Sequence, residues 1–360
     1  MEGFARELSR QLAERNWHSV LCYECQPTED VLRYLQLPNV TIELLPGSAS
    51  TNWNTFRELR RILRSHRPSI LHLHFAGFIT PYPWLARLSG VRQVYFTDHG
   101  SRPAMYTPRR APAWKRYATR LINAPVRRIF CISNYTYQCH ATLDVLPVER
   151  YQIIYNGSDF ELYSDETEPD PGLRAEYGIP DGHSIVLQVS WIIPEKGIPD
   201  LIEAARLIVA RRPDTHFIFV GEGAYREQYA RMAADFGLEK HITWTGRIPG
   251  SIGPFFRAAD IVCQVSRWNE GFGATISEAM LHAKPVIGTQ AGGIPEVIAD
   301  GQSGFVVPVS SPAVIAEKLL LLLSDPELRQ RMGRAGRLIA ESKFNVVQNV
   351  ARLLEVYDLR

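Results

Sequence analysis

Two glutamates, Glu270 and Glu278, lie eight positions apart in the segment EGFGATISE at residues 270–278. The segment follows an apolar run, DIVCQVS, that is typical of a buried strand. At 3.6 residues per turn, two such glutamates lie about two helical turns apart, so both can contact one elongated ligand. Gly271 and Gly273 let the backbone approach a ligand, and free amides at a helix N-terminus can bind phosphate or sugar oxygens. The spacing therefore predicts a ligand site, with a solvated helix face as the alternative.

These residues need strands and helices to position them, and the chain alternates the two. Helical patterns separate most of the apolar strands, as in parallel, doubly wound α/β sheets. Ligands of such sheets bind beyond the carboxyl ends of the strands, so two facing domains would form a cleft. The strands predicted in the first half are HSVLCYE, VTIELL, SILHLHF, RQVYFTDH, RIFCIS and YQIIYN, and those in the second half are SIVLQVS, THFIFVGEG, HITWTG, DIVCQV, PVIGT and GFVVP.

Length and composition indicate a globular protein with two domains. A chain of 360 residues and 40.8 kDa is too long for one ordinary core, and 45% of its residues are hydrophobic. The sequence contains no run of 18 or more apolar residues and no signal-peptide pattern at its start. Five cysteines form no disulfide framework. We therefore expect a cytoplasmic protein.

The net charge of +2 hides an asymmetry between the two halves. Residues 1–165 hold 20 Lys and Arg against 14 Asp and Glu, whereas residues 166–360 hold 20 against 24. One arginine cluster, at residues 57–67, alternates with apolar positions and is best interpreted as a solvated helix face. A second cluster, at residues 109–128, is interleaved with Trp114, Tyr117 and Leu121, which allows peripheral contact with the inner face of a membrane. No nucleic-acid-binding motif accompanies the charge, so nucleic acid is not an expected partner.

The segment from Glu270 to Glu278 resembles the Glu-x7-Glu signature of retaining glycosyltransferases of family 4, which have a GT-B fold of two Rossmann-like domains. The resemblance implies an N-terminal acceptor-side domain at residues 1–165 and a C-terminal donor-binding domain at residues 166–343. A helix in residues 344–360 would cross back to the first domain. The acidic, proline-rich stretch at residues 163–182 is interpreted as the linker.

The same resemblance assigns roles to individual residues. Glu278 would hold the donor ribose and Glu270 the sugar hydroxyls, while Lys196 in WIIPEKG would meet the donor diphosphate. His99, at the end of RQVYFTDH, resembles the strand-terminal histidine that lines the reaction centre. Backbone amides of four residues would receive sugar and phosphate oxygens: Gly271, Phe272, Gly273 and Ala274. Glycine turns elsewhere, as in FVGEG and AGGIPEVI, are expected to be architectural.

Two departures from the family pattern stand out. Trp191 occupies the place of the usual arginine, and a neutral indole cannot make the bidentate phosphate contact of a guanidinium. Arg247 in TGRIP is a candidate substitute, and Trp191 either stacks on a ring or packs in a core. The second departure is at the start, where an amphipathic helix begins almost at once. The family's first strand and glycine-rich loop would precede that helix, so we expect a gap in the first sheet and a shortened reading frame.

The expected function is a retaining hexosyltransferase (EC 2.4) that moves a sugar from a nucleotide-diphosphate sugar to a carbohydrate or lipid-linked acceptor. Polysaccharide or glycolipid synthesis is the expected context. The resemblance implies no cofactor and no metal, because helix N-termini and cations would stabilise the diphosphate. Two alternatives stay open: a nucleotide-sugar-binding protein with little or no catalysis, and a GT-B epimerase. The residues do not select the donor base, the sugar or the acceptor.

Overall fold

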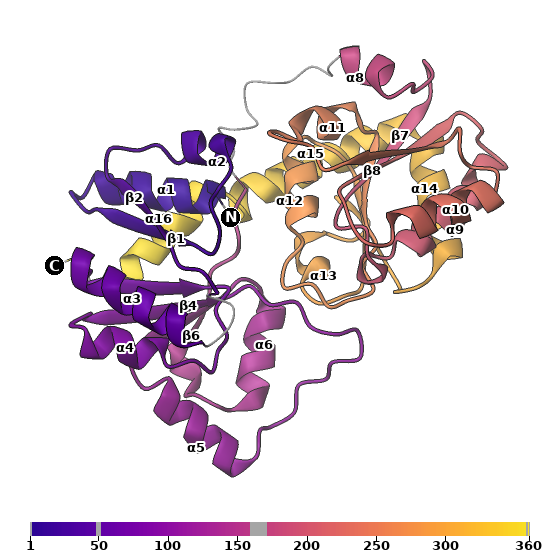
Figure 1. Cartoon of the computed structure of the whole chain (residues 1–360). Coiled ribbons are helices and arrows are strands. Elements are labelled where there is room, and N and C mark those ends of the chain that lie inside the picture. The colour runs from indigo at the N-terminus through magenta and orange to yellow at the C-terminus, as the bar shows by residue number, and fades with distance from the viewer. Residues whose placement is uncertain (1, 48–51, 159–170, 358, 360) are drawn as a thin grey trace. The chain divides into compact units, whose positions relative to one another are not determined.

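The computed structural model describes residues 2–47, 52–158, 171–357 and 359 (Figure 1). The chain divides into two compact units. Unit 1 consists of Met1–Gly100, Tyr106–Asn156 and Val346–Arg360, and unit 2 of Ser101–Met105 and Gly157–Asn345. The predicted linker at residues 163–182 lies outside the described residues as far as residue 170.

The strands of unit 1 are all parallel to their partners, as the alternating sequence pattern predicts. They form two separate sheets, one of two strands and one of four, in the orders β1-β2 and β3-β4-β5-β6. The strands are β1 (Ser19–Tyr23), β2 (Val40–Leu44), β3 (Ile70–His74), β4 (Gln93–Asp98), β5 (Val126–Cys131) and β6 (Tyr151–Ile153). Among the described residues, β1 pairs only with β2 and β3 only with β4. The interruption of the first sheet that the sequence predicts is therefore present.

Amphipathic helices and strands together supply the core of unit 1. The helices are α1 (Glu2–Ala13), α2 (Glu29–Tyr34), α3 (Trp53–His66), α4 (Tyr82–Leu88), α5 (Ala113–Ile122), α6 (Asn134–Leu143), the short 3-10 helix η1 (Val148–Arg150) and α16 (Val346–Val356). In α3, Leu59, Ile62 and Leu63 are buried and the arginines lie on the opposite, solvated face, as predicted. Helix α16 packs against α1, and its Val350 and Leu353 join Tyr95 and Phe130 in one apolar cluster.

Unit 2 contains one continuous parallel sheet in the order β12-β11-β10-β7-β8-β9. Its strands are β7 (Ser184–Val189), β8 (Thr215–Val220), β9 (Ile242–Gly246), β10 (Ile261–Gln264), β11 (Val286–Thr289) and β12 (Gly304–Val307). Every residue of β8, β10 and β11 is buried, which agrees with their mainly apolar sequences. The order runs outward from β7 in both directions, so the boundary between β7 and β10 is the switch point at which such sheets bind ligands.

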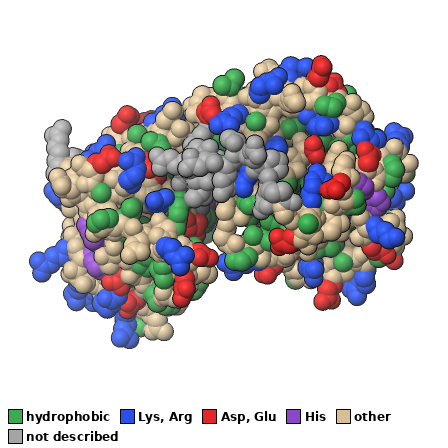
Figure 2. Space-filling view, turned by 90° about the horizontal axis from the view of Figure 1, so that it is seen from above, with side chains coloured by type: hydrophobic (Ala, Val, Ile, Leu, Met, Phe, Trp, Pro, Cys, Tyr) green, Lys and Arg blue, Asp and Glu red, His purple; other side chains and the backbone are tan. Residues whose placement is uncertain are grey.

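Helices connect the strands of unit 2. They are α8 (Pro171–Glu176), the 3-10 helix η2 (Pro194–Lys196), α9 (Ile198–Val209), α10 (Arg226–Asp235), α11 (Gly253–Ala258), α12 (Ala274–Leu281), α13 (Ile294–Val297), α14 (Pro312–Ser324) and α15 (Pro326–Lys343). The interior holds a large apolar cluster that includes α9 and α14 residues such as Leu201, Ile202 and Leu319. On the surface that Figure 2 shows, side chains of both charges are interspersed.

Candidate active site

Lys196 and Glu270 lie at the switch point of the unit 2 sheet. Lys196 ends η2, the turn that follows β7, and Glu270 lies in the loop that follows β10. Because β7 and β10 are hydrogen-bonded neighbours, their loops emerge side by side. The Nζ atom of Lys196 lies 2.7 Å from Oε1 of Glu270. The structure therefore joins two predicted site residues that are 74 positions apart in the sequence.

The Glu270 carboxylate is almost fully buried and is held by hydroxyl groups as well as by Lys196. The Ser266 hydroxyl donates to Oε1 over 2.6 Å, and the Ser101 hydroxyl donates to Oε2 over 3.2 Å. A buried carboxylate is costly unless it is paired and hydrogen-bonded, and these three partners meet that requirement. The network fixes a preorganised pair of opposite charges.

Two glycines allow the loops of this site to approach closely. Gly197 has a φ of 68°, and a Cβ atom there would lie 1.9 Å from the carbonyl oxygen of Val265. Gly292 has a φ of 61°, and its Cβ would lie 2.2 Å from the carbonyl oxygen of Glu270. The backbone amide of Gly293 donates to that same Glu270 carbonyl over 2.8 Å. The architectural role predicted for the glycine in AGGIPEVI is therefore confirmed, since any side chain at Gly292 would displace Glu270.

The segment Ser101–Met105 is part of unit 2 although the residues on both sides of it belong to unit 1. Backbone bonds between Arg102 and Asn269 in both directions, of 2.8 and 3.0 Å, tie it to the loop that carries Glu270. The Ser101 hydroxyl also lies 3.4 Å from the amide nitrogen of Gly271. The sequence pattern did not identify Ser101 or Ser266 as site residues. Ser266 ends the predicted strand run four residues before Glu270, but no sequence spacing relates Ser101 to Glu270.

Glu278 lies in the second turn of α12, which begins at Ala274 directly after the glycine segment Gly271–Gly273. Burial raises the pKa of the Glu278 carboxyl to about 7. Within the described part of the chain, its side chain has no hydrogen-bond or ion-pair partner. A partly desolvated carboxyl without a partner can accept hydrogen bonds from ligand hydroxyls. Its chemistry differs from that of Glu270, whose charge is already compensated.

The structure does not bring Arg247 to the Lys196–Glu270 pair. Arg247 is exposed and follows β9, the edge strand, which β8 separates from β7. Trp191 lies two residues after β7 and is 67% exposed. The interpretation of Trp191 as a packed core residue is therefore wrong, because the turn after β7 carries its ring into solvent. The exposed indole remains available for stacking.

His99 directly follows β4 in unit 1 and belongs to a group of neighbouring rings. Its Nε2 lies 3.0 Å from Nδ1 of His74, and its ring stacks on Phe75 with the ring centres 4.3 Å apart. Burial lowers the pKa of His99 to about 4, so the imidazole is neutral near pH 7. His99, His74, Thr97 and Asn156 line a small hollow of unit 1. A neutral imidazole there can donate or accept a hydrogen bond.

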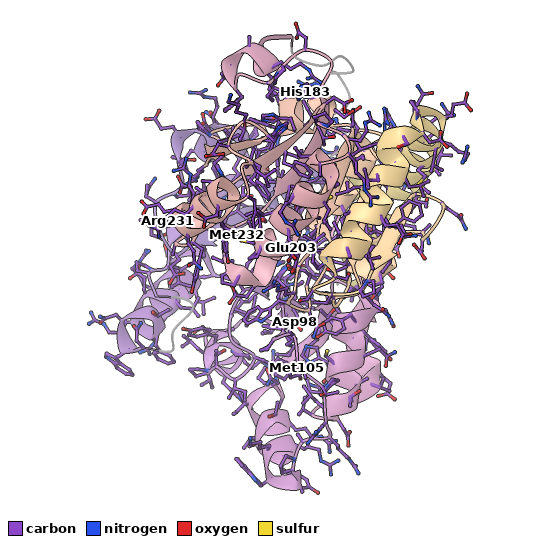
Figure 3. The ribbon with its side chains drawn as sticks, turned by 90° about the vertical axis from the view of Figure 1, so that its right-hand side faces the viewer. Asp98, Met105, His183, Glu203, Arg231 and Met232 are labelled. Carbon is purple, nitrogen blue, oxygen red and sulfur yellow. The ribbon has the colours of Figure 1, made fainter. Side chains whose placement is uncertain are left out.

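Buried side chains hold the loop after β4 in place. One oxygen of Asp98, labelled in Figure 3, accepts from the amide of Gly100, and the other lies 2.9 Å from Nε2 of His140. His72 lies 2.6 Å from the Thr97 hydroxyl, and burial lowers its pKa to about 3. His72 thus packs against Thr97, and His74 lines the hollow beside His99. In the described part of the chain, no three His, Cys, Asp or Glu side chains are grouped as a metal site.

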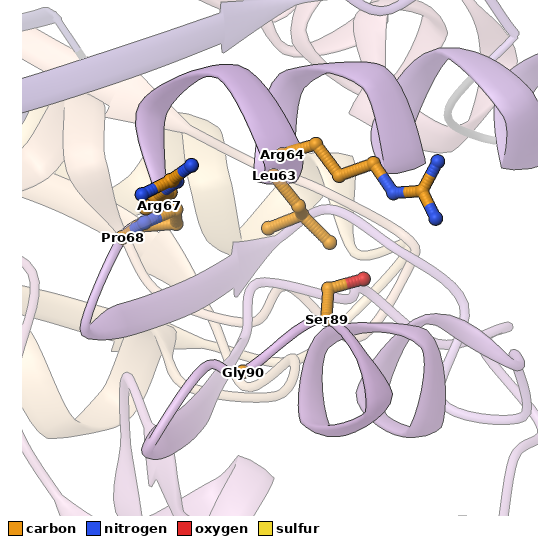
Figure 4. Close-up of a pocket in the computed structure, with 6 residues that line it drawn as sticks. All are labelled: Leu63, Arg64, Arg67, Pro68, Ser89 and Gly90. Atoms are coloured by element: carbon orange, nitrogen blue, oxygen red, sulfur yellow. The ribbon is translucent and has the colours of Figure 1, made fainter.

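A separate hollow lies between the C-terminal end of α3 and the turn after α4 (Figure 4). None of the predicted site residues lines it; its lining residues are Leu63, Arg64, Arg67, Pro68, Ser89 and Gly90. Among the described helices, none is both long enough and apolar enough to span a lipid bilayer.

The chain has two α/β units with parallel strands, and the second carries a charged pair at the switch point of its sheet. This is the fold of a GT-B protein. The glycosyltransferase from Rickettsia africae has the same fold, with a TM-score of 0.82 over 99% of this chain and 93% of that chain at 20% identity. Anabaena HepE, solved in complex with UDP and glucose, gives a TM-score of 0.76 over 98% and 94% at 19% identity. At these identities the likeness shows the fold alone.

Family models place the chain more narrowly. The model for glycosyl transferases group 1 matches residues 170–339, and that for glycosyltransferase family 4 matches residues 1–162. The chain belongs to this family of glycosyltransferases and is an enzyme of hexosyltransferase type (EC 2.4). A mannosyltransferase of Mycolicibacterium smegmatis is 27% identical over all of this chain and 94% of its own length. Its full description is GDP-mannose-dependent alpha-(1-6)-phosphatidylinositol monomannoside mannosyltransferase. The D-inositol 3-phosphate glycosyltransferase of Corynebacterium glutamicum is 34% identical over 58% of this chain and 52% of that protein.

Proposed function

We propose that the protein is a retaining glycosyltransferase that moves a hexose from a nucleotide-diphosphate sugar to a hydroxyl group of a carbohydrate or lipid-linked acceptor. The observation that carries the proposal is the ion pair of half-buried Lys196 with buried Glu270 at the switch point between β7 and β10. The relative from Mycolicibacterium smegmatis supports a lipid-linked acceptor, because its name describes a phosphatidylinositol mannoside. Polysaccharide or glycolipid synthesis is the proposed context.

Lys196 is the residue proposed to hold the donor diphosphate. When the bond between the anomeric carbon and the phosphate oxygen breaks, the leaving diphosphate gains negative charge, and an ammonium group stabilises that charge. In the ligand-free protein Glu270 is the partner of Lys196. On donor binding, Lys196 turns to the phosphate, and Glu270 accepts hydrogen bonds from the sugar hydroxyls while its contacts with Ser266 and Ser101 hold it in place.

Glu278 and His99 complete the proposed site. The Glu278 carboxyl, which lacks a protein partner in the described chain, accepts hydrogen bonds from the donor ribose. Neutral His99 contacts the donor sugar from unit 1. Backbone amides at Gly271, Phe272, Gly273 and Ala274 receive sugar and phosphate oxygens at the start of α12. Arg247 is also proposed to contact the donor, at a place separate from the Lys196–Glu270 pair.

Retention is proposed to result from attack on the face that the diphosphate leaves. The acceptor oxygen forms its bond to the anomeric carbon as the diphosphate departs, and a diphosphate oxygen takes the acceptor proton. The transition state resembles an oxocarbenium ion, as in glycoside hydrolysis. This route needs no protein nucleophile and no metal or other cofactor.

A donor screen tests the proposal. The full chain is incubated with UDP-, GDP- and ADP-sugars and with simple and lipid-linked acceptors, and the products are analysed by NMR. We expect a new glycosidic bond that keeps the donor's anomeric configuration. An inverted product would contradict retention.

Two other outcomes correspond to the alternative functions. Release of an epimerised sugar without an acceptor would indicate an epimerase. Tight nucleotide-sugar binding without transfer or hydrolysis would indicate a binding protein. The exposed Trp191 at the place of the family's arginine favours that second alternative, because the site then has one cation fewer for the leaving group.

A further inference from the structure

Helix α5 of unit 1 exposes its apolar side chains instead of burying them. Trp114, Tyr117 and Leu121 are 68%, 67% and 68% exposed, and Thr119 is the buried residue of the helix. Spacings of three and four residues place the three exposed side chains on one face. Apolar side chains gathered on one exposed helix face are typical of a surface that contacts an apolar partner. Figure 1 shows α5 at the margin of unit 1.

Helix α4 extends the same apolar surface. The indole nitrogen of Trp84 donates to the carbonyl oxygen of Leu121 over 2.8 Å, which fixes the end of α5 against α4. Trp84 is 38% exposed and Leu88, one turn further along, is 82% exposed. We call this surface the α5 face; it consists of Trp114, Tyr117 and Leu121 of α5 with Trp84 and Leu88 of α4.

Positive charge surrounds the α5 face. Between Asp98 and Asp144 the sequence contains eight Arg and Lys and no acidic residue. Asp144 binds Arg110 and Arg116. Arg109 and Lys115 are exposed and have no ion-pair partner among the described residues, and the Lys115 ammonium lies 5.4 Å from the centre of the Trp114 ring.

We propose that the α5 face docks the protein on an anionic lipid bilayer. Trp114, Tyr117 and Leu121 enter the boundary between headgroups and acyl chains, where amphipathic aromatic rings are favoured. Arg109 and Lys115 meet lipid phosphates. A bilayer fits better than a protein partner, because a long stretch without acidic side chains suits a uniformly anionic surface. The proposal does not depend on the donor chemistry, and it would bring the enzyme to lipid-linked acceptors.

Vesicle sedimentation with the full chain tests the proposal. One set of vesicles is phosphatidylcholine alone, and the other also contains phosphatidylglycerol. We expect binding to the anionic vesicles that weakens as salt rises, because added ions screen the contact. Trp114→Ser combined with Leu121→Ser should lower the binding constant by tenfold or more, as each apolar side chain removed from the interface lowers it severalfold.

Matched control variants test whether binding depends on the α5 face rather than on any exposed apolar side chain or any positive charge. Leu338 on α15 of unit 2 is also 68% exposed, so Leu338→Ser should leave vesicle binding unchanged. Arg109→Gln with Lys115→Gln should weaken binding to anionic vesicles alone, whereas Arg57→Gln with Arg60→Gln on α3 should not. All the substituted side chains are exposed, and circular dichroism checks that each variant is folded.

Three outcomes would overturn the proposal. The protein could stay in the supernatant with anionic vesicles, or the α5 variants could bind as the unchanged chain does. A loss confined to the α3 variant would move the membrane contact to α3. If size-exclusion chromatography showed an oligomer that the α5 variants dissociate, the α5 face would be a contact between copies of this chain.

Discussion

The two units use the same strand pattern but differ in the continuity of their sheets and in the charge of their candidate residues. Unit 2 has one sheet of six strands, whereas unit 1 has a pair of strands separate from a sheet of four. Unit 2 holds Lys196 and Glu270 as a compensated pair of opposite charges, whereas unit 1 holds His72, His74 and His99 with pKa values lowered by burial. We infer that unit 2 stabilises the negative charge of the leaving diphosphate, whereas unit 1 supplies neutral hydrogen-bonding groups.

The largest effect is expected in unit 2, from removal of its cation. Lys196→Ala should lower kcat/KM by about a hundredfold to a thousandfold, because the leaving diphosphate loses its charge partner. It should also weaken binding of the bare nucleoside diphosphate by about tenfold or more. Steady-state kinetics and calorimetry measure both values, and the exposed Lys240→Ala is the control.

The variant also leaves Glu270 buried without its cation, which can destabilise unit 2. The double variant Lys196→Ala with Glu270→Gln removes that unpaired charge and keeps the test open if the single variant fails to fold. Unchanged nucleotide affinity in a folded variant would remove Lys196 from the donor site.

A smaller effect, on turnover rather than on nucleotide affinity, is expected from His99. His99→Ala should lower kcat by about a hundredfold, with little change in binding of the bare nucleotide. Because burial lowers the pKa of His99 to about 4, the kcat profile of the unchanged enzyme should show no ionisation of this residue between pH 5 and pH 8. A profile whose ionisation near pH 6.5 disappears in His99→Ala would contradict the neutral role.

Trp191→Arg tests whether a second cation in unit 2, besides Lys196, would strengthen binding of the donor diphosphate. The new guanidinium would follow β7 on the exposed side of the turn, near Lys196. One added charge-assisted hydrogen bond should raise nucleoside diphosphate affinity by about tenfold. Trp191→Ala should leave that affinity unchanged and raise KM for the intact donor if the indole stacks on the sugar. If the unchanged enzyme and the two Trp191 variants had the same nucleotide affinity and the same KM for the donor, position 191 would lie away from the ligand.

The smallest effect concerns the second glutamate of unit 2. Burial raises the pKa of Glu278 from 4.5 to about 7, so the folded protein keeps a proton that the unfolded chain has lost. The stability gained from that proton is fully present below pH 4.5 and is lost as the pH rises through about 7. Glu278→Gln should therefore raise the melting temperature by a few degrees at pH 8 and leave it unchanged at pH 4.5.

The same substitution should weaken nucleotide binding severalfold at pH 8, because a neutral amide is a poorer acceptor for the ribose hydroxyls. Calorimetry at pH 6 and pH 8 measures the affinity, and scanning calorimetry measures stability. A variant that is less stable at pH 8 would show that Glu278 has a structural partner instead of a free carboxyl.

Local pattern predicted two α/β units with parallel strands, the positions of all the strands that the structure describes, and the glycine turn and helix start between Glu270 and Glu278. Those features depend on apolar periodicity and on glycine, which act over a few residues.

Tertiary structure alone decided how distant residues combine. It joined Lys196 to Glu270, brought Ser101 to the same carboxylate, and separated Arg247 from both. It also decided burial, which makes His99 neutral, raises the pKa of Glu278, and leaves Trp191 and the apolar side of α5 in solvent. Side-chain exposure and ionisation depend on all the neighbours that packing brings within a few ångströms, and a linear pattern contains no record of them.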